Sequence, residues 1–318
     1  MARRTRDTKL SLLLVLCALG CGSEPEPDDG LYPVIVNDLT YAPCDASQRV
    51  GQFTVELGDG YTAVQGRALS GVVPANVRKV EAEEGQCRLL LGRTLFCEPA
   101  CGASQTCGED GACIPYPTAQ DLGTVRVLGL KADLSMSPNS ARFYSNGATT
   151  LPHPGFDPGT DISLVTSGAE LPTFTLQGQG VAALEVPEDA ITLERGLPVT
   201  VSWTPSTASE AARLHVVVDL AHHGGIAASV ECDGIEDTGR FDIPAGLLSR
   251  LLDEGVAGFP KLTLSRRTAD STDTSAGCVE LLVLSQVERE VLIPGLMSCS
   301  TNADCPDGKT CRADLTCQ

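Results

Sequence analysis

Residues 213–220 read RLHVVVDL, and the alternation in this stretch decides the fold. Leu214, Val216, Val218 and Leu220 occupy every second position. A β-strand presents such positions on one face, because successive side chains point to opposite faces. The sequence therefore predicts a strand with one face in a core and the other outside it.

The stretches on either side have the same period. Residues 199–203, VTVSW, place two valines and Trp203 on one face, and residues 226–232, IAASVEC, alternate in the same way. We therefore expect Trp203 in the core. Further short strands are predicted at residues 32–36, 51–57, 61–65, 77–82, 87–91, 94–97, 124–130, 161–165, 173–177, 181–186, 190–193, 240–243, 261–265 and 278–293.

One helix is predicted, at residues 244–253, PAGLLSRLLD, where Pro244 suits the first turn and the leucines form an apolar stripe. Many short strands separated by Gly and Pro turns, with one helix, are typical of sandwiches. The predicted fold class is mostly β: one or more antiparallel β-sandwiches with small disulfide-rich segments. Aromatic residues make up only 4% of the chain, so the core should be aliphatic.

The fourteen cysteines carry the clearest compositional signal. An even set in an exported protein indicates a disulfide framework. Setting aside Cys17 and Cys21 leaves twelve that we expect to pair as six bridges. They are Cys44, Cys87, Cys97, Cys101, Cys107, Cys113, Cys232, Cys278, Cys299, Cys305, Cys311 and Cys317.

Two segments repeat one cysteine pattern. Residues 97–113 (CEPACGASQTCGEDGAC) and 299–318 (CSTNADCPDGKTCRADLTCQ) each hold four cysteines, and five residues separate each of the last three from the next. With so little apolar sequence, cross-links must define their shape. In the C-terminal segment the plausible pairing joins first with third and second with fourth.

The remaining four cysteines leave alternatives open. Cys232 and Cys278 are the only ones in the second half outside the C-terminal segment, so we expect them to pair. Cys44 with Cys87 is then the natural pair, and Cys87 with Cys97 is its rival. Connectivity cannot be deduced from sequence alone.

The N-terminus reads as an export signal. Residues 1–9 contain four basic side chains, residues 10–19 are apolar, and residues 18–21, ALGC, resemble the bacterial lipobox that ends in an acylated cysteine. Cys21 would then be the first mature residue and the lipid attachment site. The following GSEPEPDDG, residues 22–30, is predicted to be a solvated tether.

Together ALGC, the two four-cysteine segments and the stretch 231–248, ECDGIEDTGRFDIPAGLL, resemble uncharacterised cysteine-rich bacterial cell-surface lipoproteins. The resemblance implies a lipid on Cys21 and a disulfide role for the other cysteines, and it brings no activity. Gly22 after the cysteine is compatible with outer-membrane sorting.

These features predict six regions in chain order. They are a signal peptide at 1–20, a disordered tether at 21–30, a small β-domain at 31–96, a four-cysteine segment and linker at 97–117, a β-sandwich domain with one short helix at 118–298, and a C-terminal four-cysteine segment at 299–318.

Charge limits the partners. The formal net charge is −18, with 41 acidic and 23 basic residues. Nucleic acids and anionic membrane surfaces both require clustered Lys and Arg, so neither is expected as a partner. The lipid on Cys21 would provide the membrane attachment.

Two groups of residues are candidates for a hydrolase. Asp237-Thr238-Gly239 matches the core of the aspartic proteases, which need two carboxylates sharing a proton, but the chain has no second copy and a polar turn explains it better. His215, Asp219 and His222 form the other group.

The spacing of His215, Asp219 and His222 matches no standard zinc motif, and an exposed turn explains this group better. Several acidic clusters fit no EF-hand and are expected to be solvated surface. We predict no metal, no cofactor and no catalytic residue.

The sequence thus predicts an exported, lipid-anchored, non-enzymatic protein of the cell envelope. Its predicted location is the outer membrane, facing the periplasm or the surface. Its role would be structural or binding, with a protein or glycan partner. The alternatives are the hydrolase just described and an assembly subunit that works by β-strand addition. An exposed, uncharged edge strand would favour the assembly subunit.

Overall fold

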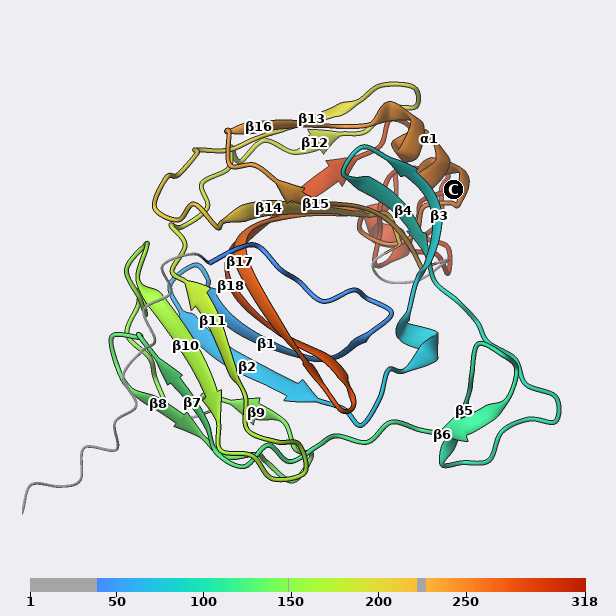
Figure 1. Cartoon of the computed structure of the whole chain (residues 1–318). Coiled ribbons are helices and arrows are strands. Elements are labelled where there is room, and N and C mark those ends of the chain that lie inside the picture. Colours follow the sequence, from blue (N-terminus) through green and yellow to red (C-terminus); the bar gives the residue numbers. More distant parts are fainter. Residues whose placement is uncertain (1–38, 148, 222–226) are drawn as a thin grey trace, which may run out of the picture. The chain divides into compact units, whose positions relative to one another are not determined.

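The computed structural model describes residues 39–147, 149–221 and 227–318. The predicted signal peptide, Cys21, the tether, the strand at 32–36 and His222 lie outside these ranges. Within them the chain is mostly β-structure with mainly antiparallel pairing, as the alternation predicts (Figure 1). No helix in the described ranges is long and apolar enough to cross a bilayer.

A ten-stranded main sheet dominates the fold. Its order is β3-β4-β15-β14-β17-β18-β1-β2-β9, with β12 also paired to β18. The strands are β1 (Arg49–Leu57), β2 (Thr62–Ala68), β3 (Lys79–Glu84), β4 (Cys87–Leu91), β9 (Tyr144–Ser145), β12 (Ile191–Thr192), β14 (Arg213–Asp219), β15 (Ala228–Ile235), β17 (Lys261–Thr274) and β18 (Gly277–Leu292).

Smaller elements accompany the main sheet. A four-stranded sheet has the order β11-β10-β7-β8, and two strand pairs are β13-β16 and β5-β6. Their bounds are β5 (Gln105–Cys107), β6 (Cys113–Pro115), β7 (Val125–Leu128), β8 (Leu134–Met136), β10 (Asp161–Thr166), β11 (Thr175–Gln179), β13 (Val199–Ser202) and β16 (Arg240–Ile243). The helices are α1 (Ala245–Asp253), the 3-10 turn η1 (Pro74–Asn76) and the 3-10 turn η2 (Asn302–Asp304).

The β17–β18 hairpin is the longest feature of the main sheet (Figure 1). Its register runs from Lys261↔Glu290 to Thr274↔Gly277. The predicted strand at 261–265 stops too early, because residues 266–274 are mostly polar. Arg266 and Thr268 are nevertheless buried, and both make hydrogen bonds to other parts of the chain.

Two apolar clusters lie against one face of the main sheet. One joins β14, β15 and β17 to β13, β16 and α1 and includes Trp203, which confirms the prediction for that residue. The other joins β1, β2 and β18 to β7, β8, β10 and β11.

Strand β18 supplies Val279 and Leu281 to the second cluster and Val291 to the first. All three have odd numbers, so they share one face of the strand. We call it the inner face, and the opposite one the outer face. The four-stranded sheet and the β13–β16 pair thus form the second layer of a sandwich.

The sheet does not divide at the predicted domain boundaries. Strands of the segments 31–96 and 118–298 pair directly, since β4 adjoins β15 and β1 adjoins β18. Both core clusters also draw residues from both segments. A strand with one apolar face can be completed equally well by a strand far away in sequence.

Other differences are local. The β1–β18 and β12–β18 pairs are parallel, unlike the antiparallel pairing predicted throughout. The predicted strands at 94–97 and 181–186 are not strands. Val181 and Leu184 are still buried, and the Leu184 amide donates to Ser285 Oγ on β18. Apolar alternation there reflects side-chain packing without a strand ladder.

Candidate functional site

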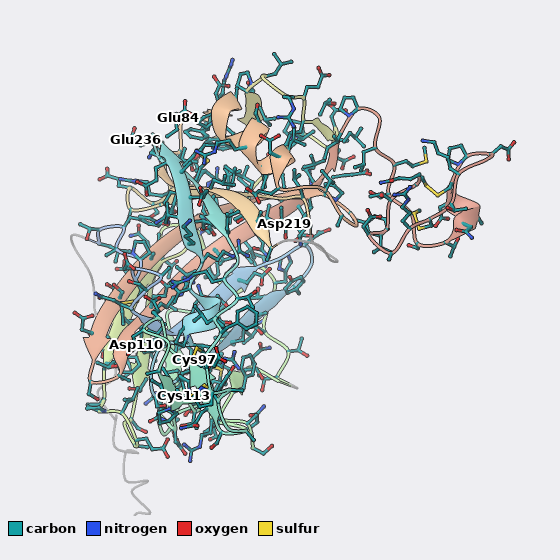
Figure 2. All side chains as sticks on the ribbon, turned by 90° about the vertical axis from the view of Figure 1, so that its right-hand side faces the viewer. Glu84, Cys97, Asp110, Cys113, Asp219 and Glu236 are labelled. Carbon is teal, nitrogen blue, oxygen red and sulfur yellow. A yellow bond between two sulfur atoms is a disulfide. The ribbon has the colours of Figure 1, made fainter. Side chains whose placement is uncertain are left out.

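All twelve cysteines in the described ranges form disulfides. In the C-terminal segment Cys299 pairs with Cys311 and Cys305 with Cys317, which confirms the first-with-third pattern. The segment 97–113 has the same pattern, with Cys97–Cys107 and Cys101–Cys113 bridges. Figure 2 labels Cys97 and Cys113 and shows the disulfides of the C-terminal segment in yellow.

The two long-range bridges differ from the expectation. Cys44 pairs with Cys278 and Cys87 with Cys232, whereas Cys44–Cys87, or Cys87–Cys97, and Cys232–Cys278 were predicted. The sheet explains the change. Cys87 on β4 lies directly opposite Cys232 on β15, with 3.9 Å between the Cα atoms. Sequence proximity misled the prediction, because the strand order brings together cysteines that are 145 residues apart.

Asp237, the proposed protease residue, is part of a buried ion pair. Its Oδ2 accepts from Arg266 Nε at 2.7 Å, and the two side chains are 8% and 2% exposed. Its Oδ1 accepts from Trp203 Nε1 at 2.6 Å, and the Ser206 amide donates to Oδ2 at 3.3 Å. Both carboxylate oxygens are therefore occupied by fixed donors.

This arrangement serves a structural purpose. Arg266 also donates to the backbone carbonyls of Ala182, Ala183 and Thr204, which lie outside the main sheet. An aspartic protease instead needs a carboxylate that shares a proton with a second carboxylate. The contacts of Asp237 and Arg266 instead link the main sheet to the segments that cover it.

Of the histidine group, the described residues are His215 and Asp219, and these two side chains lie apart on β14. His215 Nε2 lies 3.4 Å from Glu231 Oε1 on the neighbouring strand β15. Asp219, labelled in Figure 2, accepts a hydrogen bond from the Ala221 amide at the end of β14. Four residue steps along the strand place the Cα atoms of His215 and Asp219 roughly 13 Å apart. The described ranges contain metal-type clusters only among cysteines, and these are disulfide-bonded.

Acidic residues of these clusters have partners within the chain. Asp157 pairs with Lys131, Asp270 accepts from the Gln177 amide, and Asp304 caps η2 through Thr301. These contacts fit surface and turn roles.

The outer face of the main sheet carries an ionic network that sequence reasoning missed. Arg267 on β17 contacts Asp233 on β15 at 3.0 Å, and Tyr41 bonds to both. Burial raises the pKa of the Tyr41 phenol well above its usual value, although Arg267 opposes the shift. Burial also disfavours charge on Asp233, but Arg267, His215 and the hydrogen bonds from Tyr41 and the Gly234 amide together outweigh it and lower the pKa of that carboxyl.

Farther along the outer face, Glu280 on β18 holds three donors. Its side chain is 1% exposed, and it accepts from Arg49 Nη1 at 2.9 Å, Gln52 Nε2 at 2.9 Å and the Cys44 amide at 2.8 Å. The pairing of β1 with β18 places these groups together. The side chains of Arg49 and Gln52 are thereby fixed in position.

A groove of about 520 Å³ opens beside this carboxylate, over the outer face of β1 and β2. Four other surface hollows measure about 280 to 400 Å³. The groove is lined by strand residues including Arg49, Gln52 and Arg67, by the segment that leads into η1, and by Phe143. Its volume lies within the range of about 300–1,000 Å³ typical of ligand sites.

The ends of the main sheet carry little that could recruit a partner strand. At one end β3 reads KVEAEE, and at the other β9 has two residues. Charged and very short edge strands discourage pairing with another chain. Neither end meets the criterion of an exposed, uncharged edge.

Comparison with known proteins gives little further guidance. No family model matches the chain, and no curated protein matches it. One similar solved structure is the FN1–FN3 domains of chicken CNTN1, with 10% identity over 73% of this chain and 68% of that chain. Its TM-score is 0.16, so this similarity carries no argument about fold or function.

Proposed function

We propose that this chain is an exported, lipid-anchored and non-enzymatic binding protein of the cell envelope. The observation that carries the proposal is the oxidation of every cysteine in the described ranges. Six disulfides indicate folding in an oxidising compartment outside the cytoplasm. ALGC at residues 18–21 supplies the anchor through Cys21.

Two further observations support a binding role. Both carboxylate oxygens of Asp237 have fixed partners, and within the described ranges His215 lies apart from Asp219. The outer face instead carries a polar groove with fixed walls.

The mature protein extracted from membranes tests the proposal by intact mass. We expect a chain that begins at Cys21 and carries acyl groups. Twelve thiols should react with an alkylating reagent after reduction and none before it. The Cys21→Ser variant should lose the acyl mass and leave the membrane fraction, whereas Cys17→Ser should change neither.

An unacylated mature chain or free thiols before reduction would contradict the proposal. Hydrolytic activity that Asp237→Asn or His215→Ala abolishes, while the fold is retained, would instead support the hydrolase.

A further inference from the structure

We propose that the groove over β1 and β2 binds a sugar that carries a carboxylate, and that Arg67 binds this carboxylate. The inference rests on the proposed function, because it names the ligand class of the same binding protein. It follows from the charge of the groove, the fixation of its wall and the mixture of its polar groups.

The charge of the groove is opposite to that of the chain. Acidic residues outnumber basic ones 41 to 23 overall. The described residues that line the groove nevertheless include Arg49 and Arg67 and no Asp or Glu. Glu280 already balances Arg49. The groove therefore retains one uncompensated positive charge, on Arg67.

Arg67 differs from most other arginines of the chain. Its side chain is exposed, and no ion pair or hydrogen bond joins it to any other described residue. Several exposed arginines elsewhere have carboxylate partners, such as Arg195 with Asp253 and Arg240 with Asp242. A guanidinium offers five donors in a planar fork that fits a carboxylate. Arg67 is therefore available for a carboxylate from outside the chain.

The register of the sheet places Arg67 next to a fixed wall. Arg67 lies directly opposite Gln52 in the β1–β2 pair. Gln52 is in turn bonded to the buried Glu280, as is Arg49. A ligand therefore does not have to order these side chains, which lowers the entropic cost of binding.

The other polar groups favour a sugar over a simple anion. Gln52, Gln65 and Asn76 line the groove, and each amide has both donors and acceptors. A fully ionised phosphate or an isolated carboxylate can only accept hydrogen bonds, so it would use the N–H groups of these amides and leave their oxygens without a partner. Sugar hydroxyl groups both donate and accept, so they match the amides. Phe143 and Val72 provide an apolar wall for the carbon face of a ring.

Calorimetric titration of the membrane-extracted mature protein tests the inference. The probes are a trisaccharide of galacturonic acid and the same trisaccharide after its carboxylates have been reduced to alcohols. We expect the acidic sugar to bind at least about tenfold more tightly, since a charge-assisted bidentate contact is lost with the carboxylate. Higher ionic strength should weaken binding of the acidic sugar, because Arg67 is exposed.

Variants then identify the residues. Arg67→Gln should weaken binding of the acidic sugar about tenfold and leave the reduced sugar unchanged. Asn76→Ala should weaken both sugars by a similar, smaller factor. Arg312→Gln is the matched control, because it removes an exposed guanidinium from the C-terminal segment, and it should bind like the wild type.

Three outcomes would overturn the inference: no binding of the acidic sugar, equal binding of both sugars, or an unchanged affinity in Arg67→Gln. A glutamate oligomer that binds as tightly as the acidic sugar would also overturn it, because the ligand would then be an acidic peptide. None of these outcomes affects the mass of the mature protein, so failure here is distinguishable from failure of the proposed function.

Discussion

Asp237 and Arg266 show how one buried ion pair can hold the covering segments against the main sheet. Removing two charges from water costs several kcal/mol per ion, and their mutual attraction offsets this only with good geometry and additional hydrogen bonds. Trp203 and the Ser206 amide donate the additional hydrogen bonds to the carboxylate, and backbone carbonyls accept those of the guanidinium. Loss of one partner would leave the other buried and unpaired.

We therefore expect Asp237→Asn to lower the free energy of unfolding by about 3–5 kcal/mol, measured by chemical denaturation. Asp242→Asn is the control, because Asp242 contacts Arg240 at the surface, and it should behave like the wild type. A stable Asp237→Asn protein would show that the buried pair contributes little.

Tyr41 provides a test of the outer-face network through alkaline pH. Its pKa is raised by burial, so the folded state keeps the phenol protonated where the unfolded chain has begun to ionise, above about pH 10. The contribution of Tyr41 to the free energy of unfolding is fully present below about pH 10. It should fall by about 1.4 kcal/mol per pH unit as the pH rises toward the folded pKa.

Thermal melts between pH 9 and pH 11 measure this effect. Tyr41→Phe should flatten the loss of stability in this window, since phenylalanine does not ionise. Tyr116→Phe is the matched control at an exposed phenol. An identical pH dependence in Tyr41→Phe and the wild type would contradict the buried position of Tyr41.

At the scale of elements, the two long-range disulfides join strands that are far apart in sequence. We expect peptide maps under non-reducing conditions to contain Cys44 linked to Cys278 and Cys87 linked to Cys232. Replacing Cys87 and Cys232 together by alanine should lower the free energy of unfolding by roughly 4–5 kcal/mol in the chain-entropy model. Maps with a Cys232–Cys278 link would show that the sheet order is wrong.

The comparison variant lacks the Cys101–Cys113 bridge, which closes a loop with a sequence separation of 12. Its effect should be smaller, and hydrogen exchange in β4 and β15 should remain slow. Fast exchange in these strands would show that the segment 97–113 supports the main sheet.

Elements with clear local signals were predictable from sequence. Strands β4 and β16 have the predicted bounds, because turn residues flank both, and α1 begins one residue later than predicted. The end of β17 was not predictable, since the burial of Arg266 depends on Asp237. The groove escaped prediction for a similar reason: only the β1–β18 pairing shows that Glu280 fixes Arg49.

At the scale of the whole molecule, the β17–β18 hairpin links the two core clusters. Both clusters contain residues of the hairpin, so unfolding of the hairpin at one cluster would also expose part of the other. The segments 31–96 and 118–298 would unfold separately if they were independent domains. The shared hairpin predicts a single transition.

Chemical denaturation followed by two probes tests this prediction. Trp203 fluorescence reports on one cluster, and hydrogen exchange of Leu164 and Val127 reports on the other. The two midpoints should coincide. Separate midpoints would establish two domains despite the continuous sheet.

The position of β17 and β18 in the strand order also affects how the chain is made. Synthesis proceeds from the N-terminus, so β1, β2, β3 and β4 leave the ribosome long before β18. Yet β18 is the direct neighbour of β1, and it lies in the middle of the main sheet. The outer strands are thus delivered first and the centre last. β1 can pair with β2 and β3 with β4 as soon as they emerge, but the other edges of β1 and β4 stay open until β18 and β15 have been made. These open edges lengthen the period in which a chaperone is needed.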